Sequence, residues 1–321
     1  MNDAEFIQRQ IDRAPTMGGF NLATIQLDPG DYIIDQTIHV TRPVRIVGSG
    51  GTRIVLSQPD VTAFLIERHG SKQPDHSRIE DIWFTGWHGD GSKYAERGGV
   101  ALNIRAPFVE VAHCMFEYLG IGVFMNDQPS DDGTSSFADK EKVHRCRFQN
   151  CIKGLHAQGG DANAGDFTEC SFTDCRMAIH EESQLGNRYA NVMLHACPDP
   201  ADPHAHQDDS GSIVIGSQTN YSHFEACYIE RDSKPPKTAS GNVTTVGGNM
   251  CGMMTRGEIF GGHYTTFISR IVLSDGSEYQ MQVPYHTTSY DAMLFLLHTK
   301  DASSMYGLVY DPTQGWHFKK L

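Results

Sequence analysis

The chain has 321 residues and a formal net charge of −13, with 39% hydrophobic and 20% charged residues. This composition is that of a folded chain and excludes a disordered one. Its acidity, with no basic cluster, argues against nucleic acid or an anionic membrane as a partner, because their phosphates would be repelled.

The sequence contains no run of about 18 apolar residues, so we expect no membrane insertion. The first six residues, Met1 to Phe6, have neither the basic nor the apolar region of a signal peptide. The eight cysteines fall on repeat positions, which favours free thiols and folding in a reducing cytoplasm. A secreted location remains the alternative.

A short amphipathic helix is predicted first. Asp3 is suited to cap it, and Phe6, Ile7, Ile11 and Ala14 share one face. Such a helix would cover the open end of a stack of strands, as the terminal caps of repeat proteins do.

Extended segments follow at 23–35, 36–40 and 43–50. A helix followed by Leu-x-Pro-Gly-x-Tyr from Leu27, Thr-Ile-x-Val from Thr37 and an Ile-Val-Gly-Ser-Gly step resembles the opening of pectate-lyase-type β-helices. This pectin-lyase-like group includes plant-wall lyases and hydrolases, alginate epimerases and phage tailspikes. The resemblance implies an all-β, right-handed, single-stranded parallel β-helix that holds a polysaccharide along its flank. The Asp-Phe-Gly-Ala-x-Gly-Asp-Gly segment common ahead of that helix is missing.

Three later segments align without gaps on Cys114, Cys146 and Cys170, at steps of 32 and 24 residues. Each reads Cys-x-Phe, then five residues, a small residue and an aliphatic one, with weaker copies at 82–84 and 227–229. The period-two alternation predicts strands, and equivalent residues should stack about 4.8 Å apart in successive coils. The predicted inward ladders are Cys114/Cys146/Cys170, Phe116/Phe148/Phe172 and Val123/Leu155/Ile179.

The same alternation predicts two outward columns on one flank, Phe124/His156/His180 and Asn126/Gln158/Glu182. Histidine transfers protons near neutral pH, so His156 and His180 are candidate catalytic residues, with Glu182 as their partner or as an acid. Glu181 is a candidate carboxylate for a hydrolase pair with Glu182. The alternative is a solvated stacking ladder without chemistry.

Four insertions should overhang the solenoid, at 86–98, 127–141, 198–210 and 232–248. Candidate sugar contacts are Trp87, His88, Tyr94 and His204 in these loops and Asn126 and Gln158 on the flank. No cofactor or metal signature is present. A calcium ion could use Asp202, Asp208 and Asp209, but no spaced calcium-loop signature is present, and a solvated acidic loop is the better explanation.

After residue 263 the repeat stops, and alternating runs with turn residues predict a small antiparallel β module, with 290–297 as a possible helix. The predicted domains are therefore a capping helix at 1–18, the β-helix at 19–263 and the C-terminal module at 264–321. By analogy with phage spikes, such a module trimerises the shaft or binds glycans.

These features predict a polysaccharide-recognising protein. The first hypothesis is a host-attachment spike of a phage-like particle, homotrimeric and found on the virion surface after cytoplasmic assembly, with or without depolymerase activity. The second is a bacterial polysaccharide lyase, glycoside hydrolase or epimerase. A purely structural solenoid would not need the aromatic and histidine-rich loops.

Overall fold

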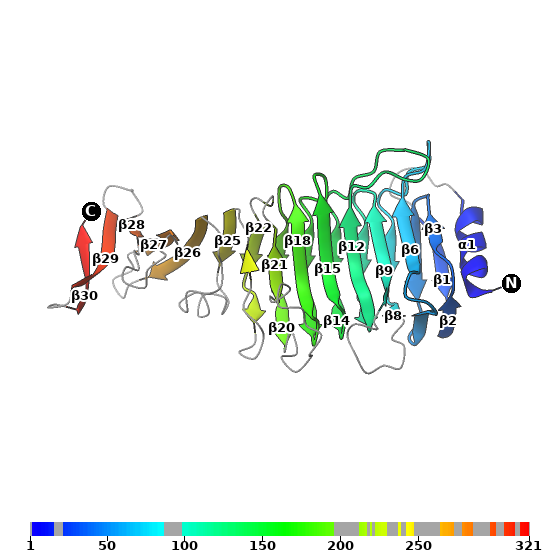
Figure 1. The fold of residues 1–321 in the computed structure, drawn as a ribbon, viewed down its shortest axis with the longest axis horizontal. Helices are drawn as coiled ribbons and strands as arrows, with labels where there is room; N and C mark the ends of the chain where they lie inside the picture. Colours follow the sequence, from blue (N-terminus) through cyan, green and yellow to red (C-terminus); the bar gives the residue numbers. More distant parts are fainter. Residues whose placement is uncertain are drawn as a thin grey trace.

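The computed structural model describes residues 2–15, 22–86, 98–195, 212–216, 219 and 222–228, together with the strands from β23 (Tyr228–Ile229) onward. Strands succeed one another in sets of three, and each member of a set joins a different sheet. The result is an elongated shaft of stacked coils (Figure 1). We call its three sheets A, B and C.

Sheet A contains β1 (Ala23–Leu27), β4 (Val44–Gly48), β7 (Arg78–Glu80), β10 (Glu110–Ala112), β13 (Lys142–His144), β16 (Asp166–Thr168), β19 (Arg188–Ala190), β22 (Ser222–Glu225) and β25 (Asn242–Val246). Sheet B contains β2 (Gly30–Ile34), β5 (Thr52–Leu56), β8 (Trp83–Thr85), β11 (Met115–Glu117), β14 (Arg147–Gln149), β17 (Ser171–Thr173), β20 (Met193–His195) and β23. Sheet C contains β3 (Ile38–Val40), β6 (Thr62–Glu67), β9 (Gly98–Arg105), β12 (Leu119–Asn126), β15 (Lys153–Gly159), β18 (Met177–Ser183), β21 (Ile213–Ile215) and β24 (Lys237–Thr238).

All these strands pair in parallel with their equivalents in the next coil, and the register follows the sequence repeat. Phe116 pairs with Phe148 and Phe148 with Phe172, while Val123 pairs with Leu155 and Leu155 with Ile179. Parallel pairing between successive coils with all connections around one core is the parallel β-helix, so the predicted fold class is confirmed.

The core is a set of stacked ladders along the shaft axis. The Phe116, Phe148 and Phe172 rings are buried, and each neighbouring pair of ring centroids lies 4.7 Å apart at an interplanar angle of 9°. Cys114, Cys146 and Cys170 form a second buried ladder of free thiols, as predicted. Burial raises the pKa of the Cys146 thiol well above its usual range, so these sulfurs serve as small apolar packing groups.

The small residue of each repeat makes room for the phenylalanine ladder. A Cβ added to Gly122 would lie 2.8 Å from the Phe148 ring, and one added to Gly154 would lie 2.6 Å from the Phe172 ring. The third copy has Ala178 at this position, and in the coil after it Leu194 takes the place of the ladder phenylalanine. The repeat therefore records a steric match between sheets B and C.

Corners between the sheets are built by single residues in the left-handed region. His113, Arg145 and Glu169 precede the three ladder cysteines and have φ values of 54°, 55° and 55°. Each backbone N–H donates to a carbonyl of the next coil, for example Arg145 N to Thr168 O at 3.0 Å. The hydrogen bonds along the axis offset the cost of this conformation in a non-glycine residue.

The helix α1 (Asp3–Arg13) covers the end of the shaft next to β2 and β3, as predicted (Figure 1). Its cap is Asn2 and not Asp3, because the Asn2 side chain accepts the Glu5 N–H at 2.8 Å. Asp3 instead accepts the Ile33 N–H at 2.7 Å and ties the helix to the first coil. Phe6 is 39% exposed, so the buried face was predicted wrongly at that position.

Beyond the shaft, β26 (Tyr264–Val272), β27 (Glu278–Pro284), β28 (Leu296–Thr299), β29 (Met305–Asp311) and β30 (Gly315–Lys320) pair in antiparallel order. β26 also pairs in parallel with β25, so these strands continue sheet A. The suggested helix at 290–297 lies mostly outside the described residues, and its last two residues belong to β28. In the part of the chain that the structure describes, no helix is long and apolar enough to cross a membrane.

Candidate functional site

The two predicted outward columns lie on the outer face of sheet C in the predicted register. Phe124 pairs with His156, and His156 pairs with His180. Their three rings stack, with centroids 4.8 Å apart for Phe124 and His156 and 4.5 Å apart for the two histidines. A parallel sheet with aligned coils thus places two imidazoles from different coils face to face.

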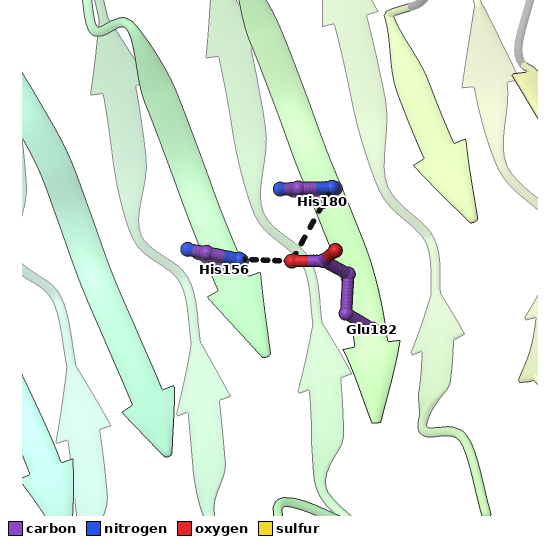
Figure 2. Close-up of side chains that lie close together, drawn as sticks. All are labelled: His156, His180 and Glu182. Carbon is purple, nitrogen blue, oxygen red and sulfur yellow. Dashed lines mark hydrogen bonds and ion pairs between the residues drawn. The ribbon is translucent and has the colours of Figure 1, made fainter. Parts of the chain in front are cut away.

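Glu182 joins the two histidines into one cluster. Its Oε2 lies 2.8 Å from His156 Nε2 and 3.5 Å from His180 Nε2 (Figure 2). The Glu182 side chain is 36% exposed, whereas those of His156 and His180 are 6% and 15% exposed. Solvent or a ligand can therefore reach the carboxylate directly, while the imidazoles support it from the sheet side.

His156 is neutral in the folded protein near pH 7. Burial, assisted by the Lys153 cation, lowers the pKa of His156 to about 3. A neutral imidazole 2.8 Å from a carboxylate donates its Nε2 proton to it, which leaves Nδ1 without a proton. Nδ1 is buried, and no donor among the described residues reaches it. The contact is thus a hydrogen bond that orients Glu182.

His156, His180 and Glu182 are also the described residues that come closest to a metal-binding set, with ligand atoms within 4.8 Å of one another. Two imidazoles bind one ion only when the ring planes both pass close to it. Here the rings lie in separate planes, 13° from parallel, and the Nε2 atoms point the same way along the flank (Figure 2). This geometry suits hydrogen bonding to a carboxylate, and one ring would have to rotate to hold a metal.

Glu181, the other predicted catalytic carboxylate, does not belong to this cluster. It faces the interior, is fully buried, and accepts hydrogen bonds from Tyr189 Oη at 2.6 Å and Asn187 Nδ2 at 2.8 Å. Burial raises its pKa, and the hydrogen bonds from Ser183, Tyr189 and Asn187 oppose that shift. The period-two alternation that turns Glu182 outward turns Glu181 inward, so the structure does not place Glu181 beside Glu182 on the flank as the predicted carboxylate pair.

The two predicted amide contacts differ in their availability. Asn126 is fully buried, donates to Asn103 Oδ1 at 2.7 Å and accepts the Gln128 N–H at 3.0 Å. Its amide is thus engaged within the protein and is not exposed on the flank. Gln158 is exposed and pairs in register with Glu182, so it lies beside the cluster on the accessible surface.

The same face carries a second polar group that the sequence did not reveal. Glu67 is buried, with His39 Nδ1 at 3.2 Å and Arg105 Nη1 at 3.5 Å. The hydrogen bond to Glu67 raises the pKa of His39. His39 continues the Phe124 column through Leu65 and Asn103. The insertion at 86–98 lies between Glu67 and Arg105 in the sequence and interrupts the repeat spacing there, which hid the alignment.

One predicted overhanging loop is described and lies against sheet C. The segment 127–141 runs back from the end of β12, and its Pro129 carbonyl accepts Arg105 Nη1 at 3.5 Å. Thr134 Oγ1 accepts the Gly70 N–H at 3.0 Å, and Asp132 lies 3.5 Å from His69 Nδ1. Hydrogen bonds from Ser130 and Thr134 hold the pKa of Asp132 well below its usual range. This loop forms one border of the flank.

The remaining predicted ligand contacts lie outside the described residues. These are Trp87, His88, Tyr94 and His204, as well as the possible calcium ligands Asp202, Asp208 and Asp209.

No protein-family model and no curated protein matches this sequence. Among solved structures, DFA-IIIase from Arthrobacter chlorophenolicus A6 matches with a TM-score of 0.47 and 16% identity over 77% of this chain and 80% of that chain. The same enzyme in complex with GF2 gives a TM-score of 0.45 and 14% identity, covering 77% and 84% of the two chains. PfbA, a surface adhesin of Streptococcus pneumoniae, gives a TM-score of 0.37 and 10% identity, covering 94% and 95%.

Proposed function

We propose that this protein binds a polysaccharide along the outer face of sheet C and transfers protons to or from it at the cluster of His156, His180 and Glu182. The observation that carries the proposal is the accessible Glu182 carboxylate, held from below by two stacked imidazoles. A carboxylate fixed by neighbouring donors and open on one side is suited to accept a proton or a hydroxyl hydrogen bond.

The length of the face fits a chain ligand. From β3 to β18 six strands of sheet C lie side by side, which at about 4.8 Å per step gives a strip of about 24 Å. Along it lie His39, Phe124, His180 and Gln158, which offer ring surfaces and polar atoms in turn. Sugars are recognised by such alternation, because their rings are apolar on the faces and polar at the edges.

The cluster divides the chemical work among its members. Glu182 is the most exposed member and the first candidate catalytic residue, and His180, 15% exposed with Nε2 at 3.5 Å from Glu182, is the second. His156 is a positioning residue, covered by its ring neighbours and bound to Glu182. In a β-elimination, Glu182 would take the proton from the sugar carbon, and the electron pair left there would form a carbon–carbon double bond as the bond to the glycosidic oxygen breaks. His180 in its protonated form would give its proton to that departing oxygen.

The test is incubation of the purified protein with bacterial capsules, lipopolysaccharides, alginate and pectins, with and without chelator. Ultraviolet absorbance of unsaturated ends, reducing ends and chain length are followed together. We expect Glu182→Gln to reduce turnover by about 100-fold or more, in line with the loss of a general base or acid. His223→Gln, a half-buried histidine on sheet A, is the matched control and should keep full activity.

Binding without any chemical change would retain the recognition half of the proposal and remove the proton-transfer half. Unchanged binding and turnover in both His180→Ala and Glu182→Gln would remove the flank from consideration.

The setting that we propose is an attachment spike on the surface of a phage-like particle, assembled as a homotrimer. The antiparallel strands β26 to β30 at the end of the shaft support this arrangement by analogy with phage spikes, whose C-terminal β modules often trimerise the shaft. Analytical ultracentrifugation tests it: a monomer at micromolar concentration would contradict the spike and favour a secreted lyase, hydrolase or epimerase.

A further inference from the structure

A hollow of about 190 Å³ opens at the corner that leads into sheet A, on the other side of the coil from residues 156 and 182. Its lining includes His76, Phe108 and Lys140 from the corner and Arg78, Glu110 and Lys142 from the strands. Three cations and one carboxylate gather there in a chain whose net charge is −13.

The corner residues are held in a fixed stack. Phe108 and His76 stack with ring centroids 4.7 Å apart, and the Lys140 ammonium lies 5.2 Å from the Phe108 centroid. The φ angles of His76, Phe108 and Lys140 are 66°, 61° and 63°. The Phe108 N–H donates to the Asp139 carbonyl of the next coil at 2.9 Å. A cation held over an aromatic face keeps its position with little loss of hydration, so Lys140 is presented to the hollow and not to bulk solvent alone.

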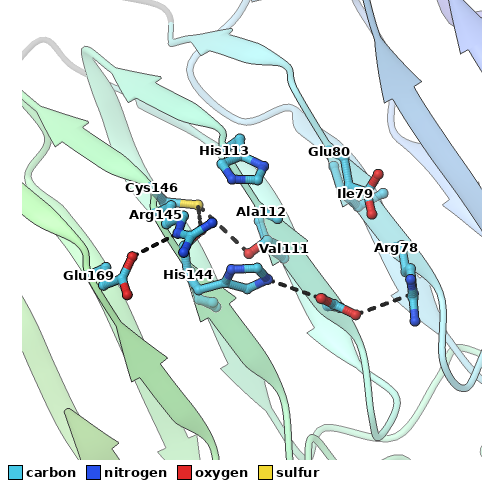
Figure 3. A network of polar contacts seen from close by, with 12 residues as sticks. Arg78, Ile79, Glu80, Val111, Ala112, His113, His144, Arg145, Cys146 and Glu169 are labelled. Carbon is cyan, nitrogen blue, oxygen red and sulfur yellow. Dashed lines mark hydrogen bonds and ion pairs between the residues drawn. The ribbon is translucent and has the colours of Figure 1, made fainter. Parts of the chain in front are cut away.

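The single carboxylate of the lining is already engaged. Glu110 forms an ion pair with Arg78 Nε at 3.2 Å and lies 3.0 Å from His144 Nε2. Figure 3 shows the Arg78 and His144 side chains on this face. Lys142 follows Glu110 in the same column, and the next residue of that column, Asp166, is bound to Arg188 at 2.6 Å. The carboxylates on both sides of Lys142 are therefore committed to other cations.

Two ammonium groups are thus left without an ion-pair partner. No carboxylate of the described residues lies within 4 Å of Lys140 or Lys142. Asp139, the acid next to Lys140 in sequence, is not part of the lining; burial raises its pKa, and the Lys140 charge opposes that shift from beyond ion-pair distance. Both ammonium groups line the same hollow, so an anion bound there could accept charge-assisted hydrogen bonds from them.

We propose that this hollow binds the carboxylate of an acidic sugar residue between Lys140 and Lys142. Its volume, about 190 Å³, suits one sugar residue, and its open side leaves room for the rest of an oligosaccharide to extend into solvent. The carboxylate would accept hydrogen bonds from the two ammonium groups, and the exposed edge of Phe108, 41% accessible, would border the sugar ring. The site is separate from the flank of sheet C and does not depend on the function proposed for it.

The experiment is isothermal titration of the full chain with short oligogalacturonates, neutral galactose oligomers, acetate and inorganic phosphate at low salt. We expect oligogalacturonate to bind more tightly than the other probes and to weaken as salt is added. The double variant Lys140→Gln/Lys142→Gln should lose at least tenfold in affinity, about 1.4 kcal/mol. Lys72→Gln, an exposed lysine outside the hollow, should leave binding unchanged.

Titration of Glu182→Gln separates this site from the flank. Affinity retained in Glu182→Gln and lost in the lysine variant places the acidic sugar in the hollow. Affinity lost in Glu182→Gln and retained in the lysine variant overturns the proposal, as does equal binding of neutral oligomers. Acetate or phosphate binding as tightly as oligogalacturonate would make the hollow a site for free anions and would also overturn it. An unchanged melting temperature of the variant shows that the loss is not unfolding.

Discussion

At the scale of single residues, His156 shows how one buried side chain links the flank to stability. Its pKa in the folded protein is about 3, below the ordinary histidine value of 6.5. The unfolded chain therefore takes up the proton first as pH falls, and the folded state loses stability between about pH 6.5 and pH 3.

The change His156→Gln tests this linkage. As pH falls from 6 to 4, the wild type should lose about 1.4 kcal/mol of unfolding free energy per pH unit because of this one proton. The free energy of unfolding of His156→Gln should fall less steeply by about the same amount. The measurement is urea unfolding at a series of pH values, compared with His223→Gln. Equal slopes for wild type and His156→Gln would show that His156 is protonated in the folded protein.

Glu181 differs from Glu182 in role although the two are adjacent. Its carboxylate accepts Tyr189 and Asn187 inside the coil, and without it these donors would remain buried and unsatisfied. Glu181→Ala should therefore cost about 2–4 kcal/mol of unfolding free energy. Glu181→Gln should cost less, about 1–3 kcal/mol, because the amide oxygen still accepts one set of donors while its NH2 group faces the other. Chemical denaturation measures both. A loss of binding or activity at full stability would contradict a structural role.

At the scale of elements, the match between the small residue and the phenylalanine ladder sets the approach of sheets B and C. Gly154→Ala would place a methyl group 2.6 Å from the Phe172 ring and from the Ala178 carbonyl. We expect a loss of about 1–3 kcal/mol from overpacking. Thermal unfolding of the double variant Gly154→Ala/Phe172→Leu should show that part of the lost stability is recovered. This variant copies the natural combination of Ala178 with Leu194 in the next coil. If Gly154→Ala were as stable as the wild type, the strands around Gly154 would be able to move away from the Phe172 ring at no cost, and the steric match would not limit the approach of sheets B and C.

The repeat explains which parts of the fold and site could be predicted. Cys-x-Phe with a small residue eight positions after the cysteine gives the register of three coils, and register alone places His156, His180 and Glu182 on one face. Burial by neighbouring coils is not encoded in that register. The Asn126 amide is bound to Asn103 in the preceding coil, and the insertion at 86–98 interrupts the repeat spacing just before Asn103. The sequence therefore could not show that the Asn126 amide is engaged.

Sequence periodicity also could not reveal sites that depend on side chains from unrelated positions. Glu67 meets His39 and Arg105 from three different coils. The hollow beside sheet A depends on Lys140, which ends a long insertion, and on Lys142, which begins a strand. Such contacts arise from the path of the loops around the shaft, and no spacing in the chain specifies that path.

At the scale of the whole molecule, the end of the shaft is a weak point. The strands of the first coil have an unpaired edge, and α1 covers it with Ile7 and Ile11, both fully buried. Ile7→Asp should destabilise the fold by about 2–4 kcal/mol and uncover strands that can pair with other chains. Light scattering coupled to size exclusion should then show self-association. Arg9→Asp, on the exposed side of α1, should remain as the wild type.

Because equivalent residues of successive coils pair in register, the shaft can be shortened without loss of strand pairing only by removal of a complete coil. Lys142 and Asp166 occupy equivalent places in adjacent coils, so excision of residues 142–165 would join Glu141 to Asp166 and leave the cross-section of the shaft unchanged. His180 would then lie beside Phe124, and Glu182 would keep one imidazole instead of two. Removal of one residue fewer would turn the following strand inside out. Chains of this architecture can therefore gain or lose binding rungs as complete units, and the reach of the flank along a polysaccharide changes in discrete steps.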